Sequence, residues 1–162
     1  MRVPALAAGP ALRPAHYAGA RLVPLRPRAV SPEAAGVLGA RLGTDLSVEL
    51  QQNRPGMLAR AAEAIASGGL NLEGFAEVDG TLHVLTADPR SARHALEAAG
   101  LRVSGERDVL VVRIEDRSGA AASVFGRLAG AGVNVRHTYV ASGHRIVIAA
   151  DEPAKALAAL QA

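Results

Sequence analysis

The chain of 162 residues contains no cysteine and no tryptophan, and aromatic residues make up only 2% of it. The absence of cysteine excludes a disulfide scaffold, a thiol nucleophile and a cysteine-ligated metal. So few aromatic residues argue against a nucleic-acid surface built on base stacking. No apolar run approaches the roughly 18 residues that a membrane-spanning helix needs. Hydrophobic residues at 49% and charged residues at 20% indicate a globular protein.

The net charge of +3 is unevenly distributed along the chain. Residues 1–43 hold six arginines and one acidic residue, Glu33, and carry +5. Residues 44–162 hold twelve basic and fourteen acidic residues and carry −2. The sequence pI of about 10.2 therefore belongs partly to the first segment. A mildly acidic body does not favour binding to DNA or RNA.

The first 43 residues form a Pro-, Ala- and Arg-rich extension, with six prolines before residue 33. This composition buries too little apolar surface to offset the entropy of ordering, so we expect residues 1–43 to be disordered. One short helix is expected within them, capped by Ser31, started by Pro32 and continued through 34–42. The alternatives are an organellar transit peptide or a basic tail for anionic partners; no secretory signal is recognisable.

The rest of the chain is an internal repeat. Asn53-Arg54-Pro55-Gly56 is followed 63 positions later by Asp116-Arg117-Ser118-Gly119. At the same offset Asn71 matches Asn134. Further matches are Ile65 with Leu128, Gly69 with Gly132, Gly80 with Gly143, Val84 with Val147 and Asp88 with Asp151. Glycine, asparagine and aspartate recur where turns demand special backbone geometry.

Each copy predicts the same order of elements. An alternating strand (46–50, then 110–114) precedes the turn and a helix with an apolar stripe, and a hairpin follows. The stripes are Leu58, Ala61, Ala62 and Ile65 in the first copy and Ala121, Val124, Phe125 and Leu128 in the second. The hairpins turn at Asp79-Gly80 and Ser142-Gly143, and Asp88-Pro89 and Asp151 open the second helices. Residues 101–106 predict a fourth strand, which the second copy lacks.

The predicted fold class is therefore α+β: a ferredoxin-like βαββαβ unit in tandem, with helices on one face of antiparallel sheets. The domains are expected at 44–107 and 108–162. An extra residue in 50–53 indicates a bulge before the first turn. The missing strand should leave an uncovered sheet edge, for which a second chain is the obvious cover, so we expect a homodimer.

The turns before the two helices could bind a zwitterion. A strand-to-helix turn presents unpaired backbone N–H groups, and Gly56 and Gly119 allow a ligand to approach the main chain. A carboxylate would gain about 0.3–1 kcal/mol from the helix dipole, and Asn53 or Asp116 could accept hydrogen bonds from an ammonium group. The same residues also make good helix starts with no ligand at all.

The chain resembles the ACT-domain family, small regulatory modules that bind amino acids. The resemblance covers about residues 45–162 and rests on 53–58 and Gly69-Leu70-Asn71-Leu72, with a weaker second copy at 116–121 and 132–135. It is similar above all to small stand-alone tandem ACT proteins, in which two modules join their sheets and the amino acid lies between them.

This resemblance implies two ligand sites, each with a turn facing the second strand of the other module. In the first, Asn134 and Val135 would face Asn53, Pro55, Gly56, Met57 and Leu58. In the second, Asn71 and Leu72 would face Asp116, Gly119, Ala120 and Ala121. Ser118 stands where the family has proline, so the second turn is less rigid.

No catalytic, metal or cofactor site is expected. The five histidines have neither the spacing nor the nearby carboxylates that a zinc site requires. They are His16, His83, His94, His137 and His144. His83 and His137 should be packed or solvent-facing on strands, His94 on the surface, and Glu73 and Glu77 solvated. Ser118 has no readable triad, and the glycines of 126–132 make no P-loop, because the single lysine is Lys155.

The function expected is that of a non-enzymatic, cytoplasmic regulator that binds an amino acid and acts on a partner enzyme or reports amino-acid levels. The alternatives are a ligand-free interaction scaffold and, with no acid/base pair to support it, a small enzyme on a ferredoxin-like sheet. No nucleic-acid or membrane partner is expected.

Overall fold

The computed structural model describes residues 36–50 and 54–161. The elements are β1 (Val37–Glu49), α1 (Met57–Ser67), β2 (Gly74–Val78), β3 (Thr81–Leu85), α2 (Pro89–Ala98), β4 (Arg102–Ile114), α3 (Ala120–Gly130), β5 (Val135–Ala141), β6 (Arg145–Ala150) and α4 (Pro153–Gln161). The class is α+β with antiparallel strands, as predicted. None of the described helices is both long and apolar enough to cross a membrane.

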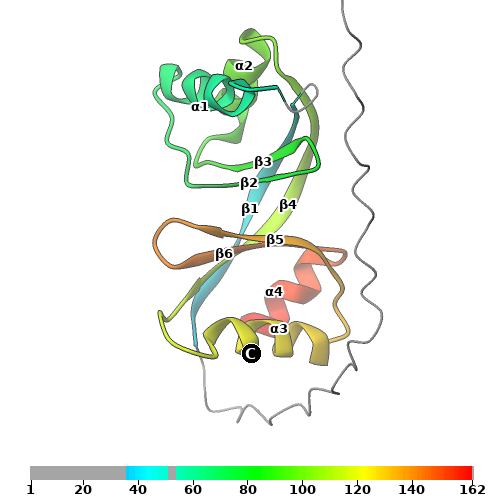
Figure 1. Cartoon of the computed structure of the whole chain (residues 1–162). Coiled ribbons are helices and arrows are strands. Elements are labelled where there is room, and N and C mark those ends of the chain that lie inside the picture. The colour runs from blue at the N-terminus through cyan, green and yellow to red at the C-terminus, as the bar shows by residue number, and fades with distance from the viewer. Residues whose placement is uncertain (1–35, 51–53, 162) are drawn as a thin grey trace, which may run out of the picture.

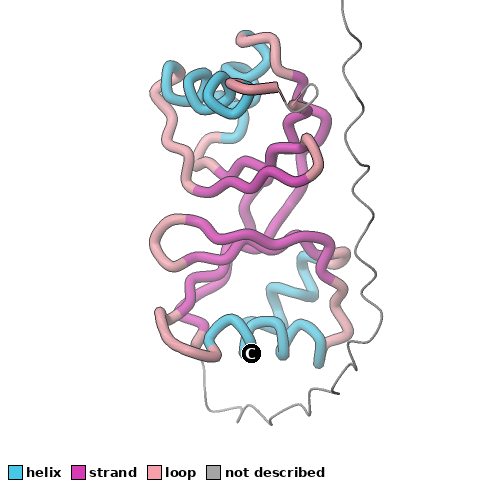
Figure 2. The backbone as a smooth tube through the Cα atoms, in the orientation of Figure 1, coloured by secondary structure: helices cyan, strands magenta, loops and turns pink. Residues whose placement is uncertain are grey.

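The strands close into one barrel in the order β1-β3-β2-β5-β6-β4, and β4 returns to β1. Two hairpins, β2–β3 and β5–β6, stack on each other, with α1 and α2 outside the first and α3 and α4 outside the second (Figures 1 and 2). The long strands β1 and β4 run through both halves. The family resemblance implies that the sheets of two modules join; their closure into a barrel was not expected, and it gives the strands around the middle of the barrel a second buried face.

Two long strands, β1 and β4, tie the halves together. The second half of β1 pairs with the start of β4, as in Asp45 with Arg107, whereas residues 37–43 pair with 109–114. On their other sides, β3 joins β1 over 45–49 and β6 joins β4 over 110–113. Each half thus has four antiparallel strands. The predicted fourth strand at 101–106 is the first part of β4, and β4 crosses the expected boundary at 107/108 without a break.

The expectation of disorder to residue 43, with a helix over 34–42, was wrong for the described residues 36–43. Val37–Gly43 belongs to β1 and supplies the fourth strand of the second half. The edge expected to be uncovered is therefore covered by the chain itself, and that reason for a homodimer disappears. The remaining residues of the extension, 1–35, and the bulge expected near 51–53 lie outside the described part of the chain.

The outer faces of the strands pack against the helices in two clusters. Leu46, Val48 and Val84 meet Ile65 of α1 and Leu96 of α2. Leu110, Val112 and Ile148 meet Val124 and Leu128 of α3, together with Ala156 and Leu160 of α4. Each fully buried aliphatic side chain contributes roughly 1.5–3 kcal/mol. The predicted stripes are confirmed at Ala61 and Ile65, but Leu58 remains 47% exposed.

The halves meet most closely where β2 pairs with β5, at Gly74 and Ala141. A Cβ on Gly74 would lie 2.6 Å from the Ala141 Cβ, so only glycine fits this contact. Next to it, the Glu73 carbonyl accepts a hydrogen bond from the Ser142 N–H at 2.8 Å. The Glu73 carboxylate also pairs with the Arg145 guanidinium at 2.6 Å, and both side chains are largely buried. Glu73, expected to be solvated, instead joins the halves.

Candidate functional site

A pocket of about 270 Å³ lies at the N-terminus of α1, close to the smallest size usual for small-molecule sites. Its lining, called here the α1 pocket, consists of Leu50, Arg54, Pro55, Gly56, Met57, Leu58, Glu77 and Gly80. The hairpin is held beside the turn by the Leu50 N–H, which donates to the Gly80 carbonyl at 2.8 Å. Four predicted ligand residues, Pro55 to Leu58, therefore line one pocket.

The α1 pocket offers groups of opposite polarity. Gly56 is the N-cap with φ of 91°, a left-handed conformation that favours glycine, and it contributes no side-chain cap. Helix geometry leaves the N–H groups of Leu58 and Ala59 without an intrahelical acceptor, and they suit a carboxylate. The Glu77 carboxylate, which accepts from the Gly80 N–H at 2.8 Å, suits an ammonium group. Leu50 and Met57 add apolar walls.

The second turn repeats the backbone but not the chemistry. Gly119 caps α3 with φ of 88°, again without a side-chain cap. The residue 63 positions after Glu77 is Val140, which is 74% exposed. Ala120 is buried, and an added Cβ on Gly36 would lie 2.9 Å from it, so the chain packs closely against this helix start. Asp116 is exposed and lies 3.7 Å from His144.

The predicted facing of each turn with the second strand of the other module is not formed within the single chain. The turn before α1 lies at the top of Figure 1 and the turn before α3 at the bottom, with both hairpins between them. Asn134 donates to Asp151 at 3.1 Å in its own half, and Val135 packs in the lower core. Asn71 is exposed, Leu72 packs in the upper core, and Asn53 lies outside the described residues.

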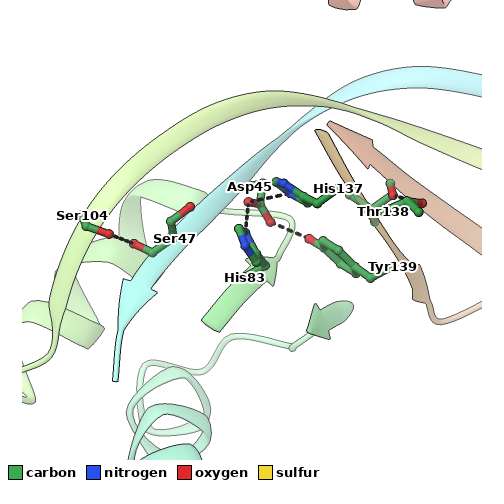
Figure 3. Close-up of polar contacts among 8 residues, drawn as sticks. Asp45, Ser47, His83, Ser104, His137, Thr138 and Tyr139 are labelled. Atoms are coloured by element: carbon green, nitrogen blue, oxygen red, sulfur yellow. Dashed lines mark hydrogen bonds and ion pairs between the residues drawn. The ribbon is translucent and has the colours of Figure 1, made fainter. Parts of the chain in front are cut away.

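A second polar site lies inside the barrel, where Asp45 of β1, His83 of β3, and His137 and Tyr139 of β5 converge (Figure 3). We call these four residues the interior cluster. Asp45 Oδ2 lies 2.8 Å from His83 Nδ1 and 3.6 Å from His137 Nε2. The Tyr139 hydroxyl donates to Asp45 Oδ1 at 2.6 Å. The imidazole centroids are 4.1 Å apart.

Burial governs the electrostatics of the interior cluster. The Asp45 side chain is 0% exposed, while the His83 and His137 side chains are 14% and 23% exposed. Burial, reinforced by the electrostatic effect of the adjacent His83 side chain, lowers the pKa of His137, which favours its neutral imidazole. Burial and the nearby Asp45 carboxylate raise the pKa of Tyr139, so its hydroxyl remains a donor.

The interior cluster was not predicted from the sequence. The expectation that no carboxylate accompanies the histidines was wrong for His83 and His137, which both lie beside Asp45. The three residues stand 38 and 54 positions apart, and only closure of the barrel brings β5 to β1 and β3. For His94, the expectation of a surface position is confirmed.

The fold is that of the regulatory, ACT-containing domains of aspartate kinase. The regulatory subunit of that enzyme from Thermus flavus aligns with a TM-score of 0.55 at 18% identity, covering 78% of this chain and 97% of that one. The ligand-free subunit from Thermus thermophilus gives 0.54 at 19% identity, covering 78% and 96%. These structures are regulatory subunits, and at this identity the likeness shows the fold.

A further solved structure, protein BT0572 from Bacteroides thetaiotaomicron, is 27% identical with a TM-score of 0.62, covering 75% of this chain and 88% of that one. No family model and no curated protein matches the chain. The resemblance to the ACT-domain family is thus confirmed by structures rather than by sequence matches.

Proposed function

We propose that the protein is a non-enzymatic regulator built from two ferredoxin-like ACT modules, and that it binds a free amino acid in the α1 pocket. The observation that carries this proposal is the pairing of a left-handed Gly56 helix start with the Glu77 carboxylate in one pocket. The amino acid's carboxylate would accept from the N–H groups of Leu58 and Ala59. Its ammonium group would meet Glu77, and its side chain would lie against Leu50 and Met57.

Binding would act by population shift. The α1 pocket joins β1, the β2–β3 hairpin and α1, so a ligand that contacts all three favours the arrangement in which they are close. The family resemblance implies that Asn134 and Val135 of a neighbouring module face this pocket, and within one chain they do not; in a homodimer a second copy would be free to supply them. The output would be the activity of a partner enzyme in the cytoplasm.

The proposal is tested by thermal unfolding of the full chain with each of the twenty amino acids. At a concentration 100 times its dissociation constant, a ligand stabilises the folded state by about 2.7 kcal/mol. We expect one amino acid, or one chemically related group, to raise the melting temperature of the wild type and of Glu63→Gln, a matched change at an exposed position of α1.

In Glu77→Gln the shift should be lost, because glutamine keeps an acceptor for the Gly80 N–H but carries no charge for the ammonium group. A flat response of the wild type across all twenty amino acids would contradict binding and favour the interaction scaffold. An equal shift in both glutamine variants would place the ligand elsewhere.

A further inference from the structure

We propose that Asp45, His83 and His137 bind a divalent transition-metal ion, of which Zn²⁺ is the representative, inside the barrel. The ligands would be one carboxylate oxygen and two imidazole nitrogens from β1, β3 and β5. This site shares no residue with the α1 pocket, and it stands or falls independently of amino-acid binding.

The ligand atoms are already gathered. One donor atom from each residue lies within 4.8 Å of the others. A metal about 2.0–2.2 Å from each ligand bridges atoms up to roughly 4 Å apart. The separations of 2.8 Å and 3.6 Å from Asp45 Oδ2 to the two imidazoles fall within that reach. The two imidazole nitrogens lie within 4.8 Å of each other, so the histidine side chains would have to move together slightly to complete the coordination.

The charge inside the barrel calls for a cation. Asp45 is fully buried, and the side chains that contact its carboxylate in the described structure are the two imidazoles and the Tyr139 hydroxyl. A buried carboxylate is costly away from water unless it is paired or coordinates a metal, and no described lysine or arginine forms an ion pair with Asp45. Among described side chains, His137 Nε2 is also buried without a hydrogen-bond partner. A metal ion satisfies both the carboxylate and this nitrogen.

The remaining contacts orient the ligands. Tyr139 donates to Oδ1 of Asp45, which leaves Oδ2 directed at the imidazoles (Figure 3). Such an outer hydrogen bond fixes a carboxylate ligand in place. The partly exposed imidazoles give an ion a way in from solvent. Two nitrogens and one oxygen suit Zn²⁺, Ni²⁺ or Co²⁺ and leave a coordination position for water.

A metal here would join the two halves. Asp45 and His83 lie on strands of the upper half and His137 on β5 of the lower half (Figure 1), and β2 and β5 pair at the single position Gly74–Ala141. An ion that ligates all three residues adds a further connection at this seam. Binding to the folded state alone should raise the melting temperature with metal concentration.

The test uses the full chain without a polyhistidine tag, freed of metal by chelator and titrated with ZnCl₂ in a calorimeter. We expect one Zn²⁺ per chain and a higher melting temperature. His137→Gln, which removes one ligand, should weaken binding by at least about tenfold, whereas His94→Gln, at an exposed helix position, should leave it unchanged. Added Co²⁺ should give visible absorption bands in the wild type and not in His137→Gln.

Tyr139→Phe keeps all three ligands but removes the hydroxyl that holds Asp45, and should weaken Zn²⁺ binding by roughly tenfold; it keeps the test decisive if His137→Gln does not fold. Absence of Zn²⁺ binding would overturn the proposal. So would unchanged affinity in both folded variants, or an equal loss in His94→Gln.

Discussion

At the scale of single residues, the two copies of the repeat use the same asparagine–aspartate pair in different ways. In the first copy Asp88 caps α2 by accepting from the Ser91 N–H at 3.1 Å and the Ser91 hydroxyl at 2.7 Å. In the second, Asp151 accepts from Asn134 at 3.1 Å and from Arg136. These hydrogen bonds lower the pKa of both carboxyl groups. Conserved spacing within a chain thus does not guarantee one role.

The Asp88 cap predicts a pH dependence of stability. Because its pKa is lower in the folded state, the ionised carboxylate contributes stability that is present above the ordinary value of 3.8 and lost as the pH falls through the folded-state pKa. Asp88→Ala removes the acceptor, and Asp88→Asn keeps an acceptor without the charge. At pH 7 we expect both variants to melt below the wild type, Asp88→Ala the lower of the two.

Thermal melts followed by circular dichroism from pH 7 to about pH 2.5 check this expectation. The gap between wild type and Asp88→Asn should close as the solution is acidified. A gap that stays constant across this range would show that the charge of Asp88 contributes nothing.

Residues that shape the backbone could be predicted from the sequence, and residues that act across the barrel could not. Gly56 and Gly119 both adopt the left-handed cap, and Asp79-Gly80 forms the hairpin turn with φ of 50° and 79°. Each of these depends on chemistry within a few positions. Glu73 and His137 appeared solvated or merely packed, because their partners lie on strands distant in the sequence.

At the scale of elements, β1 shows how tertiary pairing overrides local preference. Its first part, Val37–Gly43, contains two glycines and an arginine, and alone it has little strand character. It forms a strand because it pairs, antiparallel, with residues 109–114 of β4. The second part, which alternates through Leu46 and Val48, was predictable. The order of strands and helices in each copy followed from the repeat for the same reason, since the pattern is local.

Proline at position 41 tests the role of this strand. The Ala40 and Leu42 carbonyls accept from the side chains of Gln161 and Arg41. Both carbonyls therefore point away from β4. Because the backbone groups of successive residues in an antiparallel strand point to opposite sides, the Arg41 N–H points toward β4. Arg41→Pro removes this backbone donor, and because the Arg41 side chain is exposed, little packing is lost with it. We expect a clear drop in melting temperature.

Arg41→Ser removes the same side chain but keeps the N–H, and should melt close to the wild type. Hydrogen exchange should show faster exchange in 37–43 and 109–114 of Arg41→Pro. Equal melting of the proline and serine variants would mean that residues 37–43 do not complete the lower half.

At the scale of the whole molecule, closure of the barrel explains which expectations failed. The predicted sheets each had a helix-covered face and a solvated face. In the structure the second faces turn toward each other and enclose Leu85, Val109, Val111, Val147 and Ala149 together with the interior cluster. The apolar members Val109, Val111 and Val147 lie in unbroken apolar runs, typical of strands buried on both sides. These apolar runs could be recognised in the sequence, but the sequence did not show which strands would cover their second face.

The asymmetry of the two turns bears directly on function. Both have the same backbone, but the first faces Glu77 and the second has Val140 at the matching position. A zwitterion requires a negative partner for its ammonium group, so we expect the first turn alone to bind. This also separates the chain from a fully symmetric pair of ACT modules, in which both turns would be occupied.

The most direct measurement of the central claim is the stoichiometry of amino-acid binding, obtained by isothermal calorimetry with the amino acid that stabilises the wild type. The account predicts one molecule bound per chain in the wild type and none in Glu77→Gln. Two molecules per chain, unchanged binding in Glu77→Gln, or no binding by the wild type would contradict it.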